Sequence, residues 1–163
     1  MTHWRRLVVG AVGAVSLVGA GTASVGADGG GDHLIAFDSM TPVTGGAVGT
    51  VNDRGIKGGG LPWVITSGTG SVDRQGDVSV HVTGLIIVVP PVNGKNPVPF
   101  FKAIVSCLTP HGVMNVSTAN FPASSAGDSN INGHVDLPHP CKDPIVFVTS
   151  PGGAWFAQSN SED

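Results

Sequence analysis

The chain has 163 residues, of which 8 are Lys or Arg and 11 are Asp or Glu, so its formal net charge is −3. Charged residues make up only 12% of the chain while 40% is hydrophobic, which excludes an intrinsically disordered chain and a charged coiled coil. The negative charge also argues against nucleic-acid binding, which needs a basic surface.

The N-terminal residues have the three parts of a secretory signal peptide. Arg5 and Arg6 give a positive start, and an uncharged stretch rich in Val, Ala and Gly then runs to Ala27, which follows small residues. We predict a signal peptide over residues 1–27, cleavage after Ala27 and secretion, with only transient membrane contact. An uncleaved anchor is the alternative, because about 20 apolar residues span a bilayer, although the glycines make this stretch weakly apolar.

Cys107 and Cys141 are the only cysteines, and both lie in the part predicted to be exported. A lone pair of cysteines in an oxidising compartment usually forms a disulfide. Closing a loop of this length contributes about 3 to 4 kcal/mol to the stability of a small domain. We expect a Cys107–Cys141 disulfide, and a free reactive thiol is the alternative.

The rest of the chain is predicted to be one secreted β domain over residues 34–158. A flexible Gly-rich lead-in over 28–33 precedes it, and a polar tail over 159–163 follows it. Residues 34–37 form a short apolar run, and the glycines and proline between 41 and 60 exclude a helix there.

A β-hairpin is the clearest local prediction. Residues 63–66 and 78–85 are its expected strands, and the polar segment 73–77 is its turn. Val78, Val80 and Val82 alternate with polar residues, as expected for a strand with one buried face. Further strands are predicted over 100–108, 113–118, 131–137, 145–149 and 154–157, with a Pro-rich loop over 90–99 and another loop over 120–130.

These segments predict an all-β fold, an antiparallel β-sandwich or a barrel-like relative of seven to nine short strands, following an N-terminal signal helix. Strand order stays open, because a sandwich and a barrel share the same local pattern. Cys107 is expected on the same face as Phe101, Ala103 and Val105, so the disulfide would lie in or near the core.

His134, Asp136 and His139 are the best candidate metal ligands. Residues two apart on a strand share a face, and imidazole and carboxylate suit zinc or copper. His81, on another polar strand face, is a further candidate. The alternative is an ordinary exposed sheet face, on which such side chains gather without binding a metal.

No motif for nucleophilic catalysis occurs in the sequence, although a Ser-His-Asp triad can be assembled from distant residues. Trp63 and Trp155 are candidates for an aromatic binding surface, and the 90–99 loop is a candidate recognition loop. Aromatic residues in short apolar strands are, however, usually part of the core.

Four pieces of the chain are distinctive when taken together, namely residues 58–63, 96–99 with 103–108, 135–138 with 140–141, and 144–157. As a set they resemble a family of small uncharacterised secreted bacterial proteins. The resemblance implies export and the Cys107–Cys141 pairing, and it implies no activity, ligand or catalytic residue.

The sequence therefore favours a secreted, non-enzymatic β-sandwich module without a cofactor. Its role would be structural, or it would bind an unknown ligand outside the cell or at the envelope. The alternative is a metal-binding protein or metal-dependent enzyme that uses His134, Asp136 and His139.

Overall fold

A computed structural model describes residues 32–160. Over this range the chain forms twelve strands and one three-residue 3-10 helix, Gly45–Ala47. The predicted signal peptide and its cleavage site lie outside the described residues, as do most of the lead-in and the end of the polar tail. In residues 32–160 no helix is long and apolar enough to cross a membrane.

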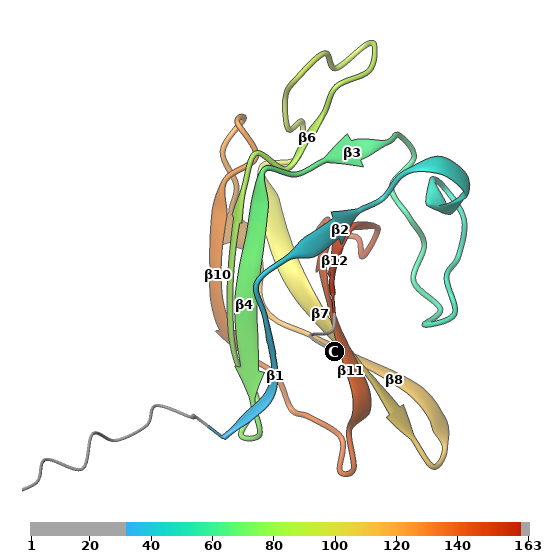
Figure 1. Cartoon of the computed structure of the whole chain (residues 1–163), viewed down its shortest axis with the longest axis vertical. Helices are drawn as coiled ribbons and strands as arrows, with labels where there is room; N and C mark the ends of the chain where they lie inside the picture. The colour runs from blue at the N-terminus through green and yellow to red at the C-terminus, as the bar shows by residue number, and fades with distance from the viewer. Residues whose placement is uncertain (1–31, 161–163) are drawn as a thin grey trace, which may run out of the picture.

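Two antiparallel sheets pack face to face, as Figure 1 shows, so the predicted sandwich is confirmed. The twelve strands exceed the predicted seven to nine, because four of them have only two or three residues; the other eight have five residues or more. The four-stranded sheet has the order β1 (His33–Phe37), β4 (Ser67–Asp73), β5 (Asp77–Thr83) and β10 (Ser129–His134).

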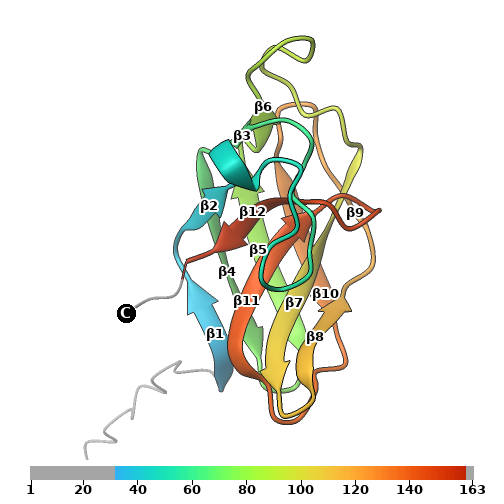
Figure 2. The ribbon, with the colours of Figure 1, turned by 90° about the vertical axis from the view of Figure 1, so that its right-hand side faces the viewer.

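The second sheet has six strands and is seen from its outer side in Figure 2. A short pair, β3 (Trp63–Val64) and β6 (Ile86–Ile87), lies apart from both sheets. The order in the six-stranded sheet is β2 (Met40–Pro42), β12 (Trp155–Ser159), β11 (Lys142–Thr149), β7 (Phe100–Thr109) and β8 (Gly112–Ser117), with β9 (Phe121–Pro122) also paired to β7.

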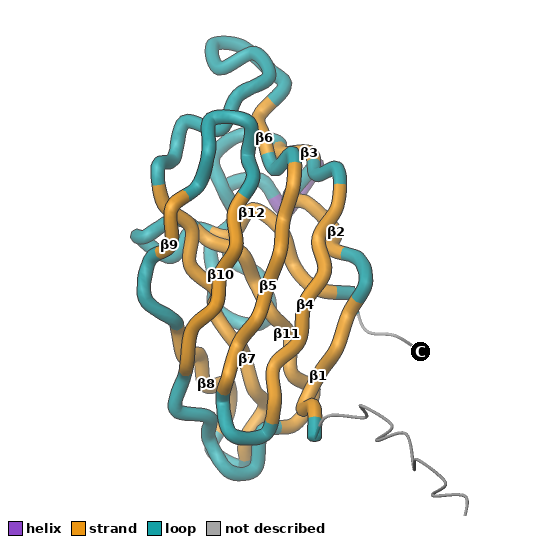
Figure 3. The backbone as a smooth tube through the Cα atoms, turned by 90° about the vertical axis from the view of Figure 1, so that its left-hand side faces the viewer, coloured by secondary structure: helices purple, strands orange, loops and turns teal. Residues whose placement is uncertain are grey.

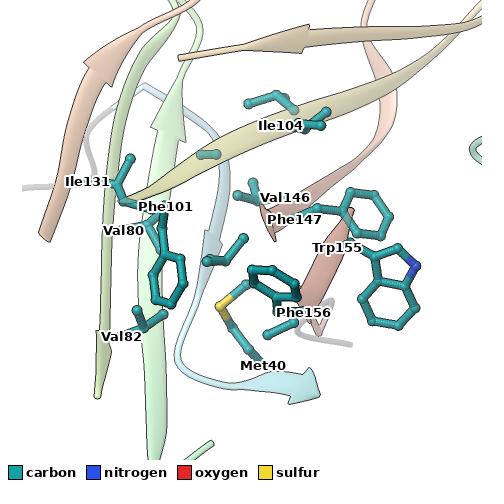
Figure 4. Packing of buried hydrophobic residues seen from close by; sticks show 14 of the residues in the cluster. Met40, Val80, Val82, Phe101, Ile104, Ile131, Val146, Phe147, Trp155 and Phe156 are labelled. Atoms are coloured by element: carbon teal, nitrogen blue, oxygen red, sulfur yellow. The ribbon is translucent and has the colours of Figure 1, made fainter. Parts of the chain in front are cut away.

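The core lies between the two sheets. In β5 the side chains of Val78, Val80 and Val82 are buried while the residues between them face solvent, which confirms the predicted alternation. Figure 4 shows Phe101 and Phe156 in this layer. The indole ring of Trp63 stacks on Phe156 with 4.0 Å between ring centroids.

A second apolar layer lies on the outer face of the six-stranded sheet. Phe147 and Trp155 meet edge to face there, apart from Phe101 and Phe156 (Figure 4). The segment 43–60 runs across this face (Figure 2) and is held to it by backbone hydrogen bonds, including Trp155 N–H to the Lys57 carbonyl at 2.9 Å. This segment therefore protects the outer face of one sheet from water.

One predicted strand pairing is wrong. The strand opposite β5 in the hairpin is β4, Ser67–Asp73, and residues 63–66 do not occupy that position. Strand β4 was not predicted because it contains Gly68 and Gly70, and glycine weakens the sequence pattern of a strand. A Cβ atom on Gly68 would lie 2.7 Å from Cγ of Met40, and one on Gly70 would lie 2.8 Å from Cζ of Phe37. The glycines thus make room for core side chains.

The other hairpins agree with the sequence. β7 and β8 pair around the turn 109–112, and β11 and β12 pair around 150–154. Four short elements fall outside the predicted strands, namely β2, β6, β9 within the expected 120–130 loop, and the single 3-10 turn. Strand β1 also begins at His33, one residue earlier than the expected start of the domain.

The disulfide between Cys107 and Cys141 is present, with a Cα–Cα distance of 4.9 Å. Cys107 is fully buried on β7, and Cys141 lies in the connection that leads from β10 to β11. The bridge therefore ties the segment that passes from one sheet to the other to β7, a central strand of the six-stranded sheet. It lies in or near the core, as expected. Such a bridge is typical of proteins in an oxidising compartment.

Candidate functional site

The outer face of the four-stranded sheet carries two of the four candidate metal ligands, His81 and His134, and Asp136 and His139 lie beyond the end of β10. Figure 3 shows this sheet in front, with β10, β5 and β4 side by side. Its polar side chains bond to one another across the strands. The pairs are His134 Nδ1 with Asp77 Oδ1 at 2.9 Å, Ser79 with Asn132 at 3.0 Å, Ser67 with Thr83 at 2.7 Å, and His81 with Asn130.

The strand register separates the candidate ligands into different environments. His134 contacts Asp77, and its Nε2 lies 4.0 Å from a carboxylate oxygen of Asp136. His139 instead lines a cavity together with Arg74 and Cys141. Nowhere in residues 32–160 are three or more His, Cys, Asp or Glu side chains placed to hold a metal ion.

Asp77 is the partner of His134 that the sequence analysis missed. The two residues lie 57 positions apart and become neighbours only through the register of β5 and β10. Both side chains are more than half exposed, at 71% for Asp77 and 55% for His134. An exposed pair of this kind adds little stability and lacks the desolvation that tunes a catalytic acid or base.

The two candidate tryptophans belong to the core. Trp63 is 2% exposed and Trp155 is 4% exposed, so neither offers a surface for binding. This outcome agrees with the alternative that the sequence left open for aromatic residues in short strands. The indole Nε1 of Trp155 has no hydrogen-bond partner among the described residues.

The Pro-rich loop is the second candidate binding surface, and it extends beyond the end of the sandwich (Figure 1). Asn96 is buried at its base and fixes the loop through its side-chain amide. Its Nδ2 donates to the carbonyl oxygens of Val98 at 2.7 Å and Ser124 at 2.9 Å. Val88, two residues before the loop, is half exposed. The loop is therefore anchored at its base and accessible beyond it.

A cavity of about 530 Å³ opens between β1 and β11, within the size range of small-molecule sites. Its walls are mainly aliphatic, from Leu34, Ile35, Pro144 and Ile145. Arg54 and Asp143 supply the charged groups. Sequence reasoning did not single out this region, because its residues come from three separate segments of the chain.

Arg54 reaches this cavity from the segment that covers the outer face of the six-stranded sheet. Its guanidinium donates to the carbonyl oxygens of Asp143 at 2.9 Å and Ser106 at 3.3 Å. Asn52 shapes the loop, since its Oδ1 accepts from the backbone N–H of Arg54 and of Ile56. Asn52 and Gly55 are turn-forming residue types, and they are the sequence signal from which this loop could have been found.

Three other cavities hold few reactive groups. The cavity beside the disulfide contains Arg74 and His139, and the cavity near β8 contains Lys57 as its charged residue. A third, at the end of β12, is lined by Ser159, whose hydroxyl accepts a hydrogen bond from Val146 N–H. None of these cavities brings a nucleophile together with a general base.

Comparison of the chain with protein-family models, with curated proteins and with solved structures finds no match. The functional interpretation of this chain therefore rests on its own sequence and structure.

Proposed function

We propose that the protein is an exported, non-enzymatic β-sandwich module with a structural or binding role outside the cell or at the envelope. The observation that carries this proposal is the disulfide between the buried Cys107 and Cys141. A bridge closing such a long loop stabilises a small domain where thiols are kept oxidised. The N-terminal signal-peptide pattern in the sequence points in the same direction.

The use of the polar side chains supports a non-enzymatic role. On the open sheet face His134, His81 and Ser79 are each bonded to a partner from a neighbouring strand. Five of the six buried polar residues in the described part of the chain, all but Ser106, are bonded to the backbone, as with Thr118, whose hydroxyl accepts from Ala103 N–H. Side chains that catalyse reactions usually converge in a desolvated cleft, and these side chains instead join strands to one another.

Where the module binds a ligand, the cavity between β1 and β11 is the best site for it. Its aliphatic walls would bury an apolar group. Arg54 forms no ion pair with a carboxylate of residues 32–160, so its charge favours a ligand that carries one.

Intact-mass measurement on untagged protein from the culture medium of an expressing bacterium tests the proposal. We expect the mass of residues 28–163, lower by two hydrogens because of the disulfide. Protein that remains in the cytosol at full length, or that carries free thiols, would contradict it.

Metal analysis of the same sample tests the non-enzymatic part. We expect no stoichiometric metal. Zinc or copper at one ion per chain, lost in a His134→Ala, His139→Ala double variant, would overturn this part and favour metal-dependent chemistry. A His33→Ala variant is the matched control, because it removes an exposed histidine from β1.

A further inference from the structure

Strand β8 is an edge of the six-stranded sheet that lacks the usual protection of such edges. It pairs only with β7, and five of its six residues are exposed. Val113 is 41% exposed and Met114 is 45% exposed. Natural sheet edges are normally kept apart from other chains by charges, proline, bulges or very short strands.

The other sheet edges of this protein have that protection. Strand β1 follows Asp32, whose carboxylate pairs with Arg74 at 2.8 Å, and β10 ends at the His134–Asp77 pair. Strand β2 has only three residues and ends in Pro42. Around β8, by contrast, the chain has no Asp, Glu, Lys or Arg between Lys102 and Asp128. Strand β8 and its flanking residues are thus uncharged, and the charged residues near it include Arg54, whose carbonyl accepts from Asn115 Nδ2 at 2.8 Å, and Lys57, which lines a cavity together with Asn115.

Hydrogen-bonding groups of β8 are available along this edge. The backbone N–H and C=O groups of the even-numbered residues of β8 point toward β7. This follows from the two-residue turn between Thr109 and Gly112, and from the hydrogen bond that Thr118 N–H donates to the Ala103 carbonyl at 3.0 Å. The backbone N–H and C=O groups of Val113, Asn115 and Ser117 therefore point outward.

We propose that two copies of this protein pair through β8, antiparallel and around a two-fold axis at Asn115. Antiparallel pairing needs odd-numbered residues opposite one another, so Asn115 faces Asn115 of the second copy and Val113 faces its Ser117. Met114 then lies opposite Val116 of the second copy, in a close non-hydrogen-bonded pair. The two six-stranded sheets become one continuous sheet.

A second copy fits this edge better than a charged partner does. The protein is acidic as a whole, so two copies repel each other except where the surface is neutral. Pairing at β8 places no charged residue of one strand opposite a residue of the other, and it covers Met114 and Val113. Because one strand pair buries less than a standard interface of about 1,200 to 2,000 Å², the dimer is weak and reversible.

Sedimentation velocity on the purified protein, with its disulfide intact, tests the proposal. Between about 10 µM and 1 mM we expect a shift from monomer to dimer. The two-fold axis creates two equivalent contacts between Met114 of one copy and Val116 of the other. Met114→Lys removes both contacts and places a charged side chain at each position, so it should raise the dimer dissociation constant about tenfold or more. Val51→Lys is the matched control, because Val51 is 64% exposed and lies outside β8. It should leave the dimer unchanged.

Cysteine cross-linking tests the register. Opposed residues in a hydrogen-bonded pair have Cα atoms about 5.5 Å apart, which suits a disulfide. Asn115→Cys should therefore form a covalent dimer on oxidation, whereas Val113→Cys, which faces Ser117, should not. A protein that stays monomeric throughout the concentration series overturns the proposal. So does a dimer that Met114→Lys leaves intact while circular dichroism shows a folded variant.

Discussion

Arg54 holds the bulge at Asp143 in place. Its Nη2 donates to the carbonyl oxygen of Asp143 at 2.9 Å, and Asp143 has a positive φ of 43°. At this point the pairing of β11 with β7 shifts, between Lys142 and Ile145. The bulge leaves carbonyl groups outside the ladder, and a guanidinium can reach two of them at once because its donors form a rigid fork.

Replacing Arg54 should destabilise the fold without altering its core. Arg54→Ala removes hydrogen bonds from a charged donor to two carbonyl groups, and we expect a loss of about 1 to 3 kcal/mol in the free energy of unfolding. Urea unfolding measures this loss. Arg74→Ala is the control, because Arg74 pairs with Asp32 on the surface and should cost less than about 1 kcal/mol. Equal losses in the two variants would refute the role given to Arg54.

Loss of the disulfide should cost more than any surface substitution. The bridge spans 34 positions, and the chain-entropy estimate for such a loop is about 3 to 4 kcal/mol. The double variant Cys107→Ala, Cys141→Ala should unfold at a correspondingly lower urea concentration. Adding a reductant should shift the native protein and leave the double variant unaffected. If the reductant leaves the unfolding midpoint of the native protein unchanged, the disulfide does not contribute the expected stability.

The hairpins of this fold could be read from the sequence, whereas contacts between distant segments could not. β7 and β8 are marked by the apolar runs on each side of Pro110 and Gly112, which are local signals. Strand β4 was missed because Gly68 and Gly70 carry no strand signal. Their role depends on Met40 and Phe37, which lie far away in the chain.

The same limit applies to the candidate site. His134 and Asp136 could be placed on one strand face from their spacing. The partner that His134 actually has, Asp77, depends on the register of β10 against β5. The place of Arg54 depends on how the segment 43–60 folds over a sheet. Neither relationship has a periodic signature in the sequence.

Trp63 should prove to be a core residue in a stability measurement. Trp63→Ala removes a ring that stacks on Phe156 and meets Phe101 edge to face, and we expect a loss of about 3 to 5 kcal/mol. Val64→Ala is the matched control, since Val64 is the next residue of β3 and is 38% exposed. It should cost less than about 1 kcal/mol. Thermal unfolding followed by circular dichroism checks both. A Trp63→Ala variant as stable as the native protein would contradict the core role of Trp63.

Gly76 should not tolerate a side chain, for two separable reasons. Its φ is +99°, which other residues rarely adopt, and a Cβ atom there would collide with the carbonyl oxygen of Val135. The backbone cannot retreat easily, because Val135 N–H donates to the Gly76 carbonyl at 2.9 Å and joins the β4–β5 turn to the end of β10.

We therefore expect Gly76→Ala to cost about 3 kcal/mol or more, measured by urea unfolding. Gly94→Ala separates backbone strain from the collision, since Gly94 has a φ of +87° and no heavy atom lies within 4 Å of its Cβ position. Strain alone should cost about 1 to 2 kcal/mol there. If both variants lose the same stability, the contact with Val135 contributes nothing, and the turn tolerates a small shift away from β10.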